Sequence, residues 1–146
     1  MADRDTGIVL LRGVGGGIIA GLLLLVIFAL SYQLWLGGIP YPTLLIFPGL
    51  PLALFVGAVS GFLVGITILF FHLIGKSPNT VVRLIVGIVV IQLASLFISI
   101  ISNDSSNVGV TGPFPPELIV IFSTINKLVL GGLPGLMARP KDYDAV

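Results

Sequence analysis

Four long apolar segments dominate the pattern of hydrophobic and polar positions along the chain. They run over about 8–36, 52–74, 80–102 and 118–137, and ten of the thirteen charged residues lie outside them, in the two termini and the loops. A helix of about 20 apolar residues is long enough to cross the hydrocarbon core of a bilayer. The pattern therefore predicts four transmembrane helices that form a single membrane domain over residues 1–146.

The connections between these spans are short, which predicts how the helices are arranged. An outer loop covers 37–51, an inner loop covers 75–79, and a second outer loop covers 103–117. Helices joined by short loops pack as antiparallel neighbours. We therefore expect an all-α integral membrane bundle of four transmembrane helices, arranged as two antiparallel hairpins.

The loop over 37–51 contains four prolines and three glycines but no charged residue. Proline removes a backbone donor and breaks helices, so this segment is expected to be irregular. Irregular backbone exposed to lipid would leave polar groups without hydrogen bonds. We therefore expect the loop to lie in the membrane interface, to dip into the membrane, or to be covered by another protein.

Composition agrees with a membrane protein and excludes several other classes. The 146 residues are 56% hydrophobic and only 9% charged, with a mean hydropathy of +1.18, whereas soluble domains are roughly 25% charged. The net charge of +1 gives no indication of nucleic-acid binding or of a soluble substrate. Membrane lipid is the surrounding medium that this composition implies.

The basic residues are sorted to one side of the predicted topology. Loops on the cytoplasmic side of a membrane carry the excess of Lys and Arg, so both termini are expected to be cytoplasmic, in a prokaryotic or organellar inner or plasma membrane. Six of the seven basic residues follow this rule: Arg4, Arg12, Lys76, Arg83, Arg139 and Lys141.

Lys127 is the exception, because it lies near the middle of the fourth span. A lysine there costs about 2.5–3.5 kcal/mol on insertion scales and usually faces the bundle interior, water or a partner. Asn126 is adjacent and Gln92 is expected at the same depth, so a Gln92–Lys127 hydrogen bond is predicted. No acidic residue lies within a span to neutralise the charge. The alternatives are a carboxylate from another subunit, an uncharged amine, and a tilted helix that lets the amine reach a headgroup.

Two trios of glycines recur every four residues and therefore line one face of a helix each. Small residues at this spacing let membrane helices approach closely, and we expect Gly21 and Gly65, judged to be at similar depth, to be in contact. The trios are Gly13, Gly17 and Gly21 in the first span, and Gly57, Gly61 and Gly65 in the second.

Few residues are available for catalysis or metal binding. The chain has no Cys, one His and six acidic residues, all of the latter at the termini or in the outer loop, whereas intramembrane acid–base chemistry needs groups at depth. We therefore expect no enzymatic activity, no metal site and no obligatory cofactor. His72, near the inner end of the second span, is the one candidate for ligating a haem or chlorophyll.

These features lead to one main functional hypothesis and two alternatives. The main one is a non-catalytic accessory subunit, with a structural or assembly role, that packs against other integral subunits of a larger complex. A respiratory or photosynthetic electron-transport complex is one such assembly. The first alternative is a small homo-oligomeric transporter or channel for an anion or polar solute, lined by Lys127, Asn126 and Gln92. The second is a pigment- or haem-binding membrane subunit that uses His72.

Overall fold

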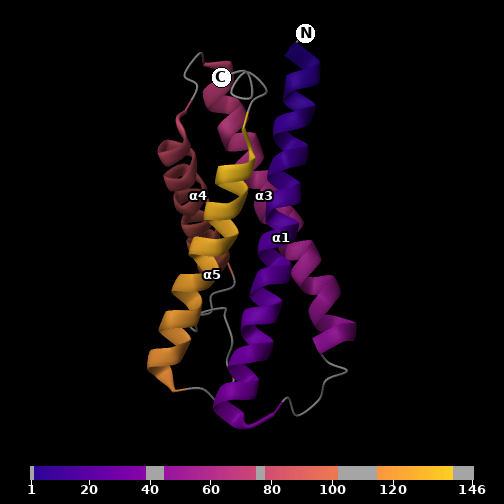
Figure 1. Ribbon diagram of the computed structural model, residues 1–146. Helices are drawn as coiled ribbons and strands as arrows, with labels where there is room; N and C mark the ends of the chain where they lie inside the picture. Colours follow the sequence, from indigo (N-terminus) through magenta and orange to yellow (C-terminus); the bar gives the residue numbers. More distant parts are fainter. Residues whose placement is uncertain (1, 39–44, 75–77, 102–114, 140–146) are drawn as a thin grey trace.

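The chain is built from helices alone over the residues that its computed structural model describes, which are 2–38, 45–74, 78–101 and 115–139. The predicted all-α architecture with four long helices is thereby confirmed (Figure 1). The elements are α1 (Ala2–Leu36), the short π-helix η1 (Leu45–Gly49), α3 (Leu50–Leu73), α4 (Thr80–Ile101) and α5 (Pro116–Met137).

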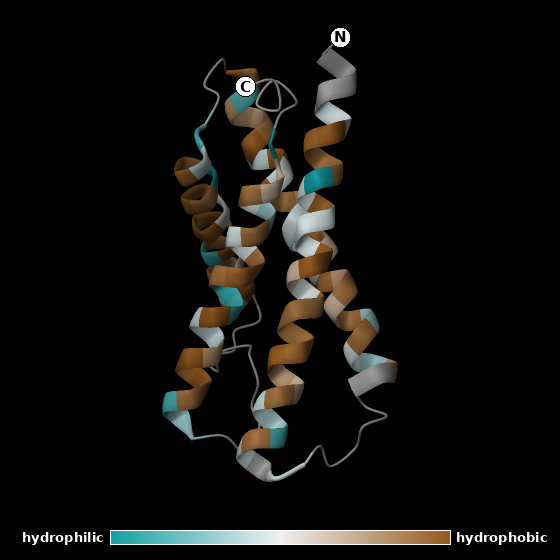
Figure 2. Ribbon diagram, viewed as in Figure 1, coloured by the Kyte–Doolittle hydropathy of each residue, from teal (hydrophilic) through white to brown (hydrophobic). Residues whose placement is uncertain are grey.

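Each of the four long helices is long and apolar enough to cross a membrane. Apolar residues cover most of their length (Figure 2), and large hydrophobic side chains such as Phe55 and Phe97 are more than half exposed. In water such a surface would drive aggregation, whereas in a bilayer it faces lipid tails. The architecture is consistent with a multi-pass membrane protein.

The expected irregular loop over 37–51 is wrong in its second half, because helical structure begins at Leu45 and α3 begins at Leu50. Pro51 lies in the first turn of α3, where the backbone N–H groups have no helical partner and a missing donor costs nothing. Proline in this segment therefore marks the start of a helix. Residues 39–44 of the same loop lie outside the described residues.

Helix α1 begins at Ala2, six residues before the start expected at residue 8. Hydropathy locates the apolar part of a helix, but the backbone hydrogen bonds of the helix continue into the polar first residues. At the start of α4, Asn79 caps the helix, since its Oδ1 accepts a hydrogen bond from the Val82 N–H at 2.9 Å.

Helices α1 and α3 meet backbone to backbone through their glycines. A Cβ built on Gly13 would lie 2.7 Å from the carbonyl oxygen of Gly61, and one built on Gly17 would overlap the carbonyl oxygen of Gly57. The order of contacts shows that the two helices run in opposite directions. The expected Gly21–Gly65 contact is wrong, because Gly21 packs against Ala53 and Gly57. The ends of the apolar runs do not give the depth of a residue accurately enough to predict the register of α1 against α3.

Helices α4 and α5 pack in the same manner, through glycines outside the two predicted trios. A Cβ on Gly87 would overlap the carbonyl oxygen of Gly131, and one on Gly131 would lie 2.5 Å from that of Gly87. These two helices also run in opposite directions. Residues 39–44 and 102–114, which would join each pair into a hairpin, lie outside the described residues, so the hairpin arrangement stays a prediction.

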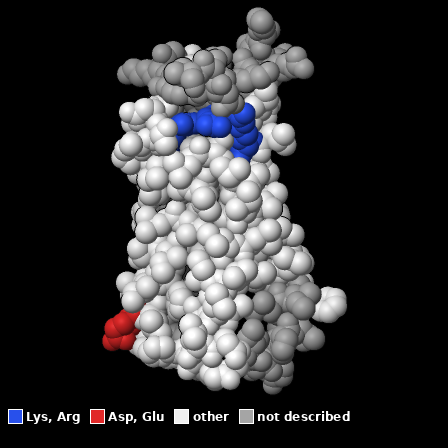
Figure 3. Space-filling model, in the orientation of Figure 1, with Lys and Arg blue, Asp and Glu red and all other residues white. Residues whose placement is uncertain are grey.

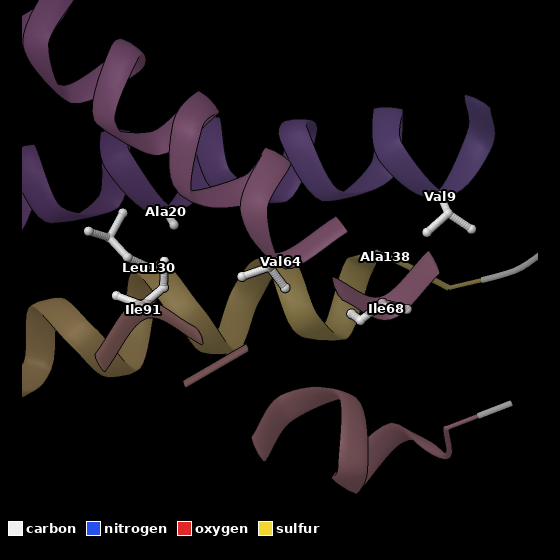
Figure 4. Close-up of a cluster of buried hydrophobic side chains, with 7 residues drawn as sticks. All are labelled: Val9, Ala20, Val64, Ile68, Ile91, Leu130 and Ala138. Atoms are coloured by element: carbon white, nitrogen blue, oxygen red, sulfur yellow. The ribbon is translucent and has the colours of Figure 1, made fainter. Parts of the chain in front are cut away.

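Helix α5 connects the two pairs, because it contacts α1 and α3 as well as α4. The α1 contact passes through Gly16, where a Cβ would lie 3.0 Å from Pro134 Cα and 3.1 Å from Met137 Cβ. Between the helices lies a small apolar core (Figure 4). It consists of Val9, Ala20, Val64, Ile68, Ile91, Leu130 and Ala138.

The glycine contacts predict paired substitutions with opposite outcomes. Gly17→Ala and Gly131→Ala place a methyl group against facing backbone, so each is expected to lower the free energy of unfolding by about 1–3 kcal/mol. Gly15→Ala and Gly132→Ala are the matched controls, since a Cβ at either position meets nothing within 4 Å. The controls should be neutral or stabilising by up to ~1 kcal/mol, because Ala favours the helix over Gly.

The measurement is unfolding of the purified protein in mixed micelles, titrated with a denaturing detergent and followed by circular dichroism. Equal changes in the free energy of unfolding for Gly17→Ala and Gly15→Ala, or for Gly131→Ala and Gly132→Ala, would contradict the glycine contacts between the helices.

Candidate functional site

Lys127 lies on the face of α5 that packs toward α4. It precedes Gly131 by four residues and Gly135 by eight, and residues at this spacing share one side of a helix. Both glycines touch the backbone of α4, and the Lys127 side chain is half-buried. The structure therefore turns this lysine toward the seam between α4 and α5.

Gln92 and Asn126 lie at the same level of this helix pair. Gly87 faces Gly131, and the two helices run in opposite directions. Gln92 follows Gly87 by five residues on α4, and Asn126 precedes Gly131 by five residues on α5. Both side chains are half-buried, as is Lys127. The structure thus brings the three predicted polar residues to one depth.

The predicted Gln92–Lys127 hydrogen bond is wrong, because neither side chain makes a hydrogen bond among the described residues. The reason is the helical position of Gln92. Ile91 follows Gly87 by four residues, so Ile91, which is buried, occupies the face toward α5. Gln92 is rotated about 100° away from that face.

The described part of the chain supplies no carboxylate near Lys127. Glu117 precedes it by ten residues, which is about 15 Å along the axis of α5. Figure 3 shows acidic and basic side chains at opposite ends of the molecule, and Glu117 lies in the first turn of α5. The remaining acidic residues are at positions 3, 5, 104, 142 and 144, none of them within the interior of a span.

Basic side chains gather at the other end, where α1 begins and α5 ends (Figure 3). Arg12 Nη1 donates a hydrogen bond of 2.9 Å to the carbonyl oxygen of Arg139. Arg83 is only 2% exposed, and its Nη2 donates to Thr80 Oγ1 at 3.1 Å. In the sequence these residues indicate topology only, and nothing there groups them beyond the position of Arg12 and Arg83 near the inner end of a predicted span.

His72 lies near the C-terminal end of α3, on the same face as Ile68 and Gly65, which precede it by four and seven residues. The side chain is half-buried, and its Nδ1 is buried without a hydrogen-bond partner among the described residues. An imidazole that ligates a metal through one nitrogen normally donates the other N–H to a carbonyl or carboxylate. Among the described residues no such acceptor lies within reach of His72 Nδ1.

Metal-binding residues do not cluster elsewhere in the described ranges. No group of three or more His, Cys, Asp or Glu residues there is placed to hold a metal ion. A haem or chlorophyll on His72 stays a prediction.

The fold and the separated charges define a class, a small multi-pass membrane bundle, but they do not extend to a family. No protein-family model, curated protein or solved structure matches the chain.

The expectation that the chain needs no obligatory haem can be tested at His72. Protein incubated with haem in detergent micelles and then freed of excess should have the same absorption above 400 nm for the wild type and for His72→Gln, since nothing described orients the imidazole. A band in the wild type that disappears in the variant would contradict this and establish the pigment- or haem-binding function.

Proposed function

We propose that the chain is a non-catalytic integral membrane subunit that packs against other subunits of a larger membrane complex, for example one of respiratory or photosynthetic electron transport. Its role in such a complex is structural, in assembly and in the ordering of lipid. The observation that carries this proposal is Lys127, a half-buried cation in the middle of α5 with no carboxylate near it in the described residues.

The charge of Lys127 requires compensation. A lysine at the centre of a transmembrane helix costs about 2.5–3.5 kcal/mol, and such residues pair with a group of opposite charge or face water. The seam between α4 and α5 provides neither a hydrogen bond to Lys127 nor a carboxylate. An acidic side chain from a neighbouring subunit would supply the missing charge.

The outer surface of α4 adjoins this seam and suits a protein neighbour. Helix α4 packs mainly against α5 and only slightly against α3, which leaves large apolar side chains such as Leu93, Phe97 and Ile101 more than half exposed. A subunit seated on this surface would lie beside the seam that holds Lys127.

The proposed orientation follows from the charges at the two ends. Arg12, Arg83 and Arg139 lie at one end and Glu117 at the other. The positive-inside rule then supports a cytoplasmic location for the arginine end and both termini. The membrane would be a prokaryotic or organellar inner or plasma membrane.

Purification in a mild detergent from the native membrane should recover a second integral membrane protein together with this chain. Lys127→Leu should release that partner, while the variant chain alone becomes more stable by up to about 2.5–3.5 kcal/mol because a costly cation is gone. Lys127→Arg is the matched control, since it keeps the charge and should retain the partner. A wild-type chain that purifies without a second protein, stable and monodisperse, would contradict the proposal.

A second candidate function is supported by the common depth of Gln92, Asn126 and Lys127. In a homo-oligomer these side chains would line a path for an anion or a polar solute, with the lysine as the attracting charge. Compensation would then come from the passing anion and from water.

This alternative predicts chloride flux into liposomes that contain the purified protein alone. Lys127→Ala should reduce the flux by about tenfold or more, because ~1.4 kcal/mol of lost attraction corresponds to a factor of ten. The chain has no native cysteine, so Lys127→Cys can also be tested with a water-soluble thiol reagent. An inert wild type and an unreactive cysteine would remove this candidate.

A further inference from the structure

We propose that one transmembrane helix of a partner protein, with an Asp or Glu near its midpoint, inserts between the outer halves of α4 and α5. The outer half of each helix is the half farther from the arginine end. The carboxylate of the inserted helix would pair with Lys127. This docking site rests on the proposed function of the chain as a subunit, and it specifies where the partner binds and which kind of residue the partner contributes.

The seam between α4 and α5 is closed in one half and open in the other. None of the residues over 92–101 of α4 or 116–129 of α5 is buried. The buried residues of the two helices all lie nearer the arginine end. They are Arg83, Gly87 and Ile91 on α4, and Leu130, Gly131, Gly132, Pro134 and Gly135 on α5.

The exposed residues of the outer half include those on the faces that meet at the glycines. On α4, Ile98 follows the buried Ile91 by seven residues and so lies on the same face, yet it is 55% exposed. On α5, Val120 precedes Gly131 by eleven residues, about three helical turns, and is 61% exposed. In Figure 1 the first turn of α5 lies well apart from α4. The two helices therefore diverge beyond Gly87 and Gly131, and their facing sides become accessible.

Lys127 lies where this open part of the seam begins. It is three residues from the buried Leu130, and it shares a face with Val120, which is seven residues away. Its half-buried side chain makes no hydrogen bond among the described residues. The rest of the open seam is apolar, because Thr124 Oγ1 donates to the carbonyl oxygen of Val120 at 2.9 Å and Ile98 lies opposite. A helix that is apolar except for one acidic residue complements such a surface in shape and charge.

Other occupants match only one of these two features. Lipid tails would cover the apolar sides of the seam but carry no charge at this depth. Water would hydrate the amine but would leave the apolar side chains exposed to it. A second copy of the chain has no acidic residue in the interior of a span, so it cannot bring a carboxylate to the level of Lys127. A partner helix with an acidic residue at mid-membrane provides both the apolar contact and the opposite charge.

A synthetic peptide takes the place of the partner in the test. It has about 20 leucine and alanine residues, enough to span a bilayer, with one Glu at its centre and one Cys about seven residues away, on the same helical face. The chain has no native cysteine, so Val120→Cys places a single thiol in the open seam. The full chain and the peptide are reconstituted together in liposomes, and the rate of disulfide formation under mild oxidation is measured.

The Glu peptide should cross-link to Val120→Cys about tenfold faster than a matching peptide with Leu in place of Glu. A hydrogen bond to a charged group is worth at least that factor. Adding Lys127→Leu should abolish this preference for the Glu peptide, and adding Lys127→Arg should retain it. Leu30→Cys on α1 is the matched position outside the seam, since Leu30 is 57% exposed, and it should show no preference between the peptides.

Several results would overturn this docking site. Equal rates for the Glu and Leu peptides at Val120→Cys would show contact without recognition of the charge. The same preference at Leu30→Cys would place the contact elsewhere. A disulfide that forms between two copies of Val120→Cys in preference to the peptide would show that a second copy occupies the seam. The absence of any cross-link would leave the seam to lipid or water.

Circular dichroism checks that each variant is folded, and the comparison of the two peptides stays valid if the Lys127 variants do not fold. Failure of the subunit function is a separate outcome, because it is read from co-purification out of the native membrane. A partner that co-purifies and is released by Lys127→Leu, without a Glu-dependent cross-link at Val120→Cys, would leave the subunit function intact and overturn only the docking site.

Discussion

Direct contact between helix backbones is the constraint on which the rest of this structure depends. Lipid tails are as apolar as leucine, so no hydrophobic force draws the helices together, and association requires close packing. Glycines provide that packing where α1 meets α3 and where α4 meets α5, with Gly17 against Gly57 and Gly87 against Gly131. At each seam the glycine hydrogen that replaces a side chain points at a carbonyl oxygen of the other helix, a geometry that weak Cα–H···O contacts favour. Gly16 then ties α1 to α5.

The seams also decide where the charged side chains lie. Gly135 touches the backbone of Arg83, and Gly131 lies one turn from Lys127. Because the backbones are so close, a long side chain beside a seam must follow the groove between two helices or turn outward. Arg83 is nearly fully buried in this way, and Lys127 is half-buried. Packing and electrostatics are therefore coupled in this bundle, because the glycines that bring the helices together also decide where its basic side chains lie.

Hydropathy and small-residue spacing were enough to predict the four helices and the glycine faces of the first two spans. They could not predict register, because apolar runs fix a helix only to within several residues and Gly21 consequently found a different partner. Gly87 was missed because it stands alone in α4, and a single glycine carries no periodic signal until its partner Gly131 is known. The arginine cluster was missed for a related reason: Arg12 and Arg83 are 71 positions apart in the sequence, and only the packing of α1 and α4 on the end of α5 brings them together.

The depth of Lys127 decides what can compensate its charge. Phospholipids carry their negative charge only at the headgroups, so at the level of Lys127 the lipid offers only hydrocarbon. A compensating charge must therefore come from a protein side chain or from water admitted by a pore. The position of this half-buried cation beside a glycine seam thus favours a protein neighbour or an aqueous path over lipid.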